Sequence, residues 1–188
     1  LMVYYNGINT GWVKKSQLKE GGAVGSGSYS FSSRGENVLK YIELPYPPHS
    51  NYYANYFVMN GTAIQDIYFQ YAGDWGITIG WGTYVPTVQG HDVTTDGINR
   101  LKKHGMTDAD INHVNGIIVS YKNHSTSAAD KKIYFNQINT YLQSKNLKTS
   151  ISDCDDYFNE EVAVHAKRLN FLKDNDYSSL NMSQTQFD

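Results

Sequence analysis

A glycine-punctuated stretch near the middle of the chain constrains the fold most. Residues 51–85 are rich in Tyr, Phe, Val, Ile and Thr, which favour β-strands. The glycines that interrupt this stretch are Gly61, Gly73, Gly76, Gly80 and Gly82. Glycine permits the positive φ angles of tight turns, and Asn60-Gly61 is a strong hairpin dipeptide. We therefore predict a β-hairpin or a small meander over residues 51–85.

From Asp92 onward, apolar residues recur at helical spacing. Thr95–His104 is predicted to be a short helix that Gly105 ends. Three further helices are expected to begin at Ser/Thr-x-x-Asp sequences, which are Thr107–Asp110, Ser127–Asp130 and Ser152–Asp155. Another helix is predicted ahead of the strands, over Ser33–Leu44, with a capping box formed by Ser33 and Glu36. A small sheet flanked by helices indicates the α+β class.

Composition narrows the functional classes. The 188 residues suffice for one domain plus an appendage. A net charge of −2 argues against a nucleic-acid-binding surface, and no apolar run approaches the roughly 20 residues of a membrane span. The single cysteine, Cys154, cannot form an internal disulfide. The histidines fit no metal-binding spacing that we recognise, so we expect neither a metal nor a cofactor.

Glu43 is the leading candidate for acid–base chemistry. It lies in the last turn of the first predicted helix, where the negative end of the helix dipole disfavours a carboxylate. A stripe of apolar side chains precedes it, formed by Val38, Leu39 and Ile42. Both effects favour the neutral carboxylic acid that a general acid requires. The alternatives are a solvated helix-end residue at this position, and Glu36 as the true acid.

Residues 73–83 form a second candidate feature. A threonine and an aspartate stand among glycines there, and these groups can hold a water molecule or a sugar hydroxyl. Glycines allow the backbone to approach a ligand closely. The alternative interpretation is a tight hairpin with buried Ile and Trp side chains.

Together, these segments resemble the phage-type lysozymes, the endolysin-like muramidase family. Residues 32–43 read SSRGENVLKYIE, with the family's spacing from glycine to glutamate, and residues 71–82 read YAGDWGITIGWG, similar to the family's hairpin. Residues 180–188, LNMSQTQFD, are similar to the start of the family's central buried helix. The resemblance implies a lysozyme-like α+β fold over residues 31–188, with its C-terminal part missing. Loss of that helix is expected to leave a groove lined by Val114, Ile118, Phe158 and Val162.

The resemblance also implies site residues. Glu43 matches the catalytic acid, Asp74 best matches the family's aspartate, and Thr78 matches the threonine that holds the hydrolytic water with it. Asp66 is a rival to Asp74, because Asp74 lies four residues before Thr78 where the family usually has six. Thr83 replaces the family's histidine. Aromatic rings suit sugar faces, so Tyr46, Trp75 and Trp81 are expected to bind substrate. Thr83 is expected to bind substrate as well. The alternative for the aromatic residues is that about half of them fill the core.

The N-terminal segment suggests a targeting module. Residues 1–18 are predicted to form a hairpin, and they resemble the end of a bacterial cell-wall-binding repeat of the Gly-Trp or Src-homology-like type. Residues 19–30 are glycine-rich and are expected to be a linker.

These observations favour a secreted, monomeric cell-wall hydrolase of bacterial or prophage origin. Its substrate would be peptidoglycan, cleaved with inversion at the β-1,4 bond between N-acetylmuramic acid and N-acetylglucosamine. The alternatives are a non-catalytic wall- or glycan-binding domain and a structural component of a phage tail.

Overall fold

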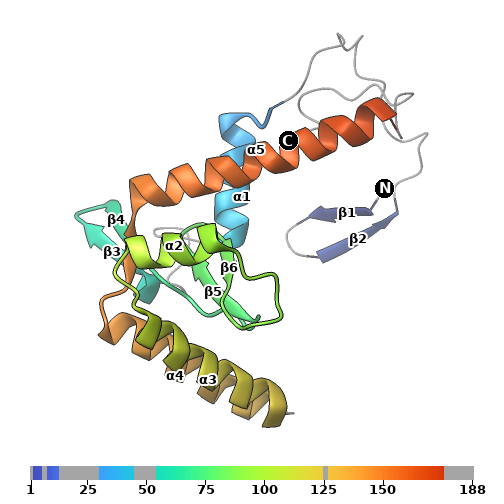
Figure 1. Ribbon diagram of the computed structural model, residues 1–188. Coiled ribbons are helices and arrows are strands. Elements are labelled where there is room, and N and C mark those ends of the chain that lie inside the picture. Colours follow the sequence, from blue (N-terminus) through green and yellow to red (C-terminus); the bar gives the residue numbers. More distant parts are fainter. Residues whose placement is uncertain (1, 6–7, 13–29, 45–53, 125–126, 176–188) are drawn as a thin grey trace. The chain divides into compact units, whose positions relative to one another are not determined.

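The computed structural model describes residues 2–5, 8–12, 30–44, 54–124 and 127–175. Helices alternate with small antiparallel sheets, which confirms the α+β class (Figure 1). The chain divides into two compact units. The first unit comprises Leu1–Glu36 and Ala163–Asp188, and the second comprises Asn37–Val162. Within the described ranges, no helix has both the length and the apolar character that crossing a membrane requires.

The first unit begins with the predicted hairpin. Strand β1 (Met2–Tyr5) pairs antiparallel with β2 (Ile8–Trp12), and Tyr5 lies opposite Ile8. Of the expected linker over residues 19–30, only Ser30 is described. The helix start expected within residues 180–188 also lies outside the described residues, as does the predicted site residue Tyr46.

Helix α1 (Ser33–Glu43) confirms the predicted helix but differs from the prediction at its start. The N-cap is Ser32 rather than Ser33, because the Ser32 hydroxyl accepts a hydrogen bond from the Gly35 N–H at 3.1 Å. The predicted apolar stripe is not buried, since Val38 is 50% exposed and Ile42 is 64% exposed. Further along α1, the residues that pack are Lys40, whose side chain is 15% exposed, and Leu44, just after the helix.

The second unit contains a three-stranded sheet. Strands β3 (Phe57–Asn60) and β4 (Ala63–Tyr68) form the hairpin predicted at Asn60-Gly61, and a 3-10 turn, η2 (Ala54–Tyr56), precedes it. The other edge of β4 pairs antiparallel with β7 (Lys148–Ser150). The predicted meander did not include this third strand, which comes from a distant part of the sequence.

A second hairpin follows in the same unit. Strands β5 (Gly76–Ile79) and β6 (Thr83–Pro86) are antiparallel and confirm the β-structure predicted up to residue 85. The turn between them contains Gly80 with a φ of +54° and Gly82 with a φ of +106°. Side chains rarely tolerate such φ values, so the turn requires glycine at these positions.

Helices make up most of the remaining described chain. They are α2 (Thr95–Lys103), α3 (Asp108–His124), α4 (Ala128–Ser144) and α5 (Ile151–Asn175). The predicted cap of α3 is confirmed, since the Thr107 hydroxyl accepts from the Asp110 N–H at 3.2 Å. The predicted cap of α4 is also confirmed, with the Ser127 hydroxyl as the acceptor.

Helix α5 begins earlier than predicted. Its cap is Ser150, whose hydroxyl accepts from the Asp153 N–H at 3.2 Å, whereas the prediction placed the cap at Ser152. The reason is that β7 runs directly into α5. Ser150 is therefore the last extended residue, and Ser152 is already helical.

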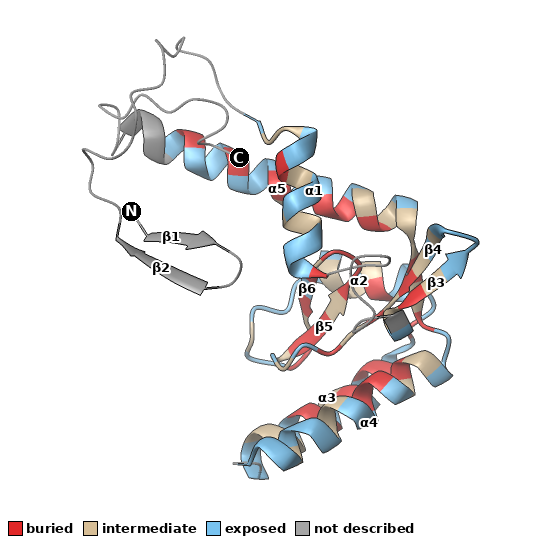
Figure 2. Ribbon diagram, turned by 180° about the vertical axis from the view of Figure 1, so that it is seen from behind, coloured by how far each residue is buried: buried red, intermediate tan, exposed pale blue. Residues whose placement is uncertain are grey.

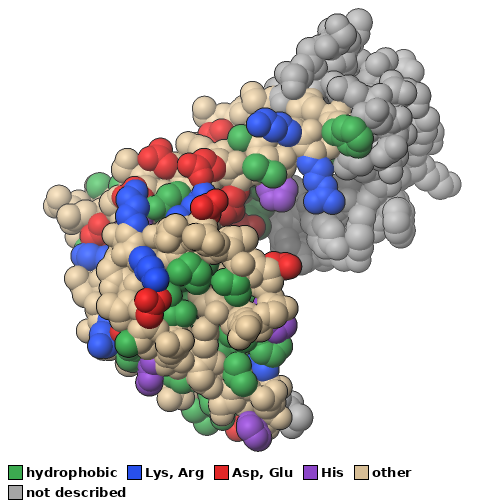
Figure 3. Space-filling view, in the orientation of Figure 1, with side chains coloured by type: hydrophobic (Ala, Val, Ile, Leu, Met, Phe, Trp, Pro, Cys, Tyr) green, Lys and Arg blue, Asp and Glu red, His purple; other side chains and the backbone are tan. Residues whose placement is uncertain are grey.

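The core of the second unit joins the β5–β6 hairpin to the helices. Ile77, Ile79 and Val85 pack in one buried cluster with residues of α3 and α4, and Figure 2 shows the buried faces of these elements. Among the described residues, the groove expected from a missing helix is not found. Its four expected lining residues, Val114, Ile118, Phe158 and Val162, are all buried. On the surface, ion pairs join α2 to α5, Arg100 to Glu160 at 2.5 Å and Lys103 to Asp153 at 2.6 Å, and Figure 3 shows acidic and basic side chains interspersed there.

Candidate functional site

Glu43 lies against the glycine turn between β5 and β6. A Cβ atom built on Gly82 would lie 2.9 Å from Oε2 of Glu43 and 3.2 Å from its Cγ. Both the close approach and the positive φ of this residue exclude a larger side chain without displacement. The structure thus brings together the two segments in which the sequence placed candidate chemistry.

One carboxylate fixes the end of α1 near this turn. Oδ1 of Asp155 accepts hydrogen bonds from the Lys40 ammonium and from the Trp81 indole Nε1–H, both at 2.7 Å. The ammonium group also lies over the Trp81 ring, 5.8 Å from its centroid. Because Lys40 is three residues before Glu43 on the same helix, this contact orients the face that carries the candidate acid. Sequence reasoning assigned Asp155 only to a helix first turn.

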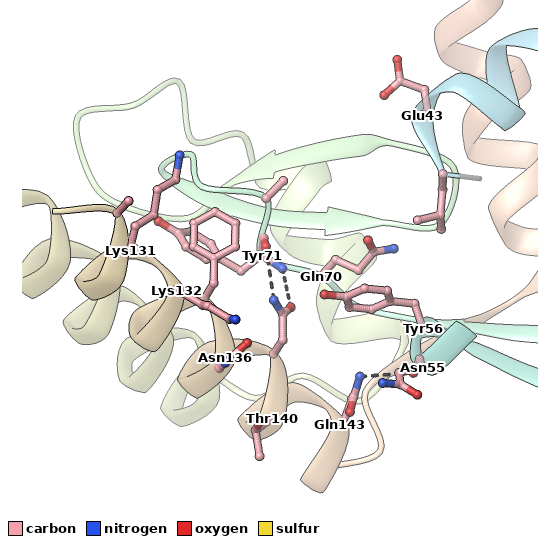
Figure 4. Close-up of a pocket in the computed structure, with 15 residues that line it drawn as sticks. Glu43, Asn55, Tyr56, Gln70, Tyr71, Lys131, Lys132, Asn136, Thr140 and Gln143 are labelled. Atoms are coloured by element: carbon pink, nitrogen blue, oxygen red, sulfur yellow. Dashed lines mark hydrogen bonds between the residues drawn. The ribbon is translucent and has the colours of Figure 1, made fainter. Parts of the chain in front are cut away.

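A cavity of about 720 Å³ opens beside Glu43 (Figure 4). It is lined from four parts of the second unit: the end of α1, η2, the segment after β4, and α4. The lining residues outside α4 are Glu43, Leu44, Asn55, Tyr56, Gln70, Tyr71 and Ala72. Figure 4 shows Gln70 and Tyr56 reaching into this space on the same side as Glu43.

One face of α4 forms the opposite wall. Its lining residues recur every three or four positions, and they are Ala128, Lys131, Lys132, Phe135, Asn136, Asn139, Thr140 and Gln143. From the first to the last, this face is about 22 Å long at 1.5 Å per residue. The cavity is therefore elongated, and five of its lining residues carry amide side chains, which are Asn55, Gln70, Asn136, Asn139 and Gln143.

Hydrogen bonds hold the wall in place. The Asn139 side chain accepts from the Tyr71 N–H at 2.8 Å and donates to the Tyr71 carbonyl at 3.4 Å. At the end of α4, the Gln143 amide donates to the Asn55 carbonyl at 3.2 Å. The Gln70 amide nitrogen and the Tyr71 hydroxyl are buried and have no hydrogen-bond partner within the described residues. Burial, with smaller contributions from Tyr121 and Asp74, raises the pKa of Tyr71, so this hydroxyl stays neutral.

Thr78 shares a face of the sheet with a cavity residue. Thr78 and Gln70 are directly opposite, with backbone N–H···O distances of 2.8 and 3.0 Å in the two directions. Tyr84 lies opposite Thr78 on the other side. Side chains of directly opposed residues point to the same face, so Thr78 and Gln70 share one. The buried Ile77 and Ile79 point to the other face.

The structure does not bring Asp74 into the cavity. Asp74 is exposed in the loop before β5, whereas Glu43 lies at the turn after β5. The charge of Asp74 acts on Tyr84, because burial and, less strongly, the Asp74 carboxylate raise the pKa of the Tyr84 hydroxyl. That hydroxyl accepts a hydrogen bond from the Trp75 N–H at 3.0 Å.

Asp66, the rival second carboxylate, is placed elsewhere. It lies on the central strand β4, between β3 and β7. Its carboxylate forms an ion pair with Lys148 at 3.0 Å and is 15% exposed. Asp66 does not line the cavity. The ion pair with Lys148 joins β4 to β7, which is a structural role.

Of the predicted substrate-binding residues, the three that the structure describes, Trp75, Trp81 and Thr83, also lie outside the cavity lining. Trp75 stacks on His91, with 4.1 Å between ring centroids. Trp81 is 5% exposed and Thr83 is 2% exposed, and the Thr83 hydroxyl has no partner in the described part of the chain. The alternative acid, Glu36, lies seven residues before Glu43 and does not line the cavity.

Sequence reasoning missed most of the cavity. Gln70 stands in β-prone sequence, where nothing distinguishes it from neighbouring strand residues, whereas Tyr56 belongs to the aromatic residues that suit sugar faces. The α4 face carried a usable pattern, because Asn136, Asn139 and Gln143 recur at helical spacing on a polar stripe. A polar stripe on a helix ordinarily faces solvent. This stripe lines a cavity because other segments of the chain lie opposite it.

Metal chemistry gains no support in the described residues, where no three His, Cys, Asp or Glu side chains are arranged to hold an ion. Comparisons with protein-family models, with curated proteins and with solved structures find no match to this chain.

Proposed function

We propose that this chain carries the catalytic part of a peptidoglycan hydrolase, a muramidase, that acts on the bacterial cell wall outside the cell. The bond cleaved is the β-1,4 linkage between N-acetylmuramic acid and N-acetylglucosamine. The observation that carries the proposal is the contact between Glu43 and Gly82 at an elongated cavity. A carboxyl group at the edge of a groove is the position that a general acid for glycan cleavage needs.

The proposed mechanism assigns Glu43 to the leaving group. Its carboxyl group protonates the glycosidic oxygen, while a water molecule attacks the anomeric carbon from the opposite face. Thr78 and Asp74 are proposed to hold that water. Inverting hydrolysis places the two carboxyl groups roughly 6.5–9.5 Å apart when substrate is bound. Since Asp74 lies in the loop before β5, this loop would have to approach Glu43 in the complex.

The chemistry of the cavity supports a glycan substrate. Amide side chains pair well with sugar hydroxyls and with N-acetyl groups, because each amide both donates and accepts hydrogen bonds. Tyr56 and Phe135 add aromatic rings suited to the apolar faces of sugars. The length of the α4 face suits a polymer better than a single small molecule.

A second candidate is a non-catalytic glycan-binding domain. The observation that favours it is that Glu43 is the only acidic side chain among the described residues that line the cavity. Two carboxylates are usual in glycoside hydrolases. A domain with one would bind the glycan without cleaving it.

Purified cell walls distinguish the two functions. We expect the chain to lower the turbidity of a wall suspension and to release new reducing ends of N-acetylmuramic acid. A binding domain would sediment with the walls but release none. Absence of both sedimentation and release would contradict either function.

A further inference from the structure

Two adjacent lysines of one helix line one end of the cavity. Lys131 and Lys132 lie close to the start of α4 (Ala128–Ser144). The N-terminus of a helix carries a partial positive charge, so cations there are unfavourable. The acidic residue of the same turn, Asp130, instead accepts a hydrogen bond from the Ser127 hydroxyl at 2.6 Å.

Neither lysine is neutralised within the described part of the chain, where no ion pair of Lys131 or Lys132 with an acidic residue is found. The ammonium group of Lys131 lies 5.6 Å from the centroid of the Phe135 ring, which also lines the cavity. Both lysines are exposed and both line the cavity. Their charge is therefore available to a ligand bound along α4.

The lysines are remote from the candidate acid. Figure 4 shows Lys131 and Lys132 on the side of the cavity away from Glu43. A group held by the lysines at that end therefore belongs to a different unit of the polymer from the one that meets Glu43.

We propose that Lys131 and Lys132 form a subsite for the carboxylate groups of the peptide that N-acetylmuramic acid carries. This inference rests on the proposed function, because it assumes that a wall glycan occupies the cavity. An ammonium pair binds oxyanions through charge-assisted hydrogen bonds, and the peptide supplies them at regular intervals along the glycan. The subsite selects peptide-bearing strands over neutral glycans.

The test measures binding of soluble glycans to the whole chain carrying Glu43→Gln, which prevents cleavage. One ligand is a wall glycan fragment with its peptides, and the other is a neutral N-acetylglucosamine oligomer. The double variant Lys131→Gln/Lys132→Gln is expected to bind the peptide-bearing fragment about tenfold more weakly, the effect of two exposed ion pairs. Binding of the neutral oligomer is expected to be unchanged.

The matched control is Lys102→Gln/Lys145→Gln, which removes the same charge outside the cavity lining. We expect it to bind both ligands as the parent does. A second measurement needs no substitution. Added salt should weaken binding of the peptide-bearing fragment to the parent chain and leave binding of the neutral oligomer unchanged.

Three outcomes would overturn the subsite. The first is equal binding of the peptide-bearing fragment by the double variant and the control, and the second is an equal loss on the neutral oligomer. The third is a loss seen only with wall glycan fragments that also carry teichoic acid phosphates, which would assign the lysines to phosphate. If the parent binds neither glycan, the proposed function itself fails.

Discussion

The carboxylate of Glu43 lies against Gly82, so the end of α1, which lines the cavity, packs on the β5–β6 turn. Contacts from another part of the chain hold each of these two segments in place. The helix end is fixed by the contact of Lys40 with Asp155, and the turn is fixed by the contact of Trp81 with the same oxygen. The candidate site therefore depends on a small set of contacts that can be changed singly.

Gly82→Ala is expected to reduce wall lysis and stability together. The new Cβ would meet Oε2 of Glu43 at 2.9 Å, on a backbone with a φ of +106°. Strain of this kind costs about 1–3 kcal/mol. Gly90→Ala is the control, since its φ is +91° but a Cβ there meets no atom within 4 Å. Thermal melting and wall turbidity measure both effects, and equal lysis by the two variants would contradict the contact.

Asp155→Asn is expected to loosen the end of α1. The substitution keeps the shape of the side chain but removes the charge that pairs with Lys40, whose side chain is only 15% exposed. A weakened partner for a half-buried cation costs about 1–2 kcal/mol of unfolding free energy. The control is Asp156→Asn on the exposed side of α5. Denaturant unfolding compares the two, and equal midpoints would show that the Asp155 contact contributes nothing.

Asp74→Asn and Asp66→Asn are expected to have opposite effects. Under the proposed mechanism, loss of the Asp74 carboxylate slows wall lysis by about 10²-fold or more, since acid–base groups contribute about 10²–10⁴. Loss of the Asp66 charge removes its pairing with Lys148 and lowers stability while sparing the rate. Steady-state lysis and melting curves distinguish them. If Asp66→Asn lyses walls slowly and Asp74→Asn lyses them at the parent rate, Asp66 is the second catalytic carboxylate.

Asp110 is expected to make stability dependent on acid pH. Burial alone would raise its pKa, but hydrogen bonds from Thr107 and Tyr141 lower the pKa to about 2. Because the folded pKa lies below the unfolded value, the stabilisation is full above about pH 4 and is lost as the pH falls towards 2. At neutral pH, Asp110→Asn should cost about 2 kcal/mol.

The pH test compares unfolding free energies at neutral pH and near pH 2. The gap between the parent chain and Asp110→Asn should narrow in acid. The control, Asp108→Asn, removes a carboxylate that is 77% exposed on the same helix and should change little at either pH. If the difference in unfolding free energy between the parent and Asp110→Asn stays constant with pH, the lowered pKa of Asp110 is not its cause.

Local sequence patterns predicted most of the elements. The caps at Thr107 and Ser127 were predicted correctly, and α3 and α4 begin where these residues predicted. Where two serines compete, local pattern is insufficient. The choice of Ser150 over Ser152 depends on the pairing of β7 with β4, which is a contact between distant segments.

The site was less predictable for the same reason. Glu43 was found from its helix position and its motif, both of which are local. The burial of Trp81 depends on Asp155, and the cavity depends on α4 facing Gln70 and Tyr71. These are tertiary contacts that no spacing in the sequence encodes. The exposure of Ile42, which sequence periodicity assigned to a buried stripe, has the same origin.

The most direct test of the account is the rate of wall lysis by Glu43→Gln, compared with Glu36→Gln in the same whole chain. Both substitutions remove one carboxyl group from α1, so they change charge and helix propensity alike. The account predicts that Glu43→Gln lowers the rate by about 10²–10⁴ at an unchanged melting temperature, while Glu36→Gln retains the parent rate. Near-normal lysis by Glu43→Gln together with loss in Glu36→Gln would contradict it.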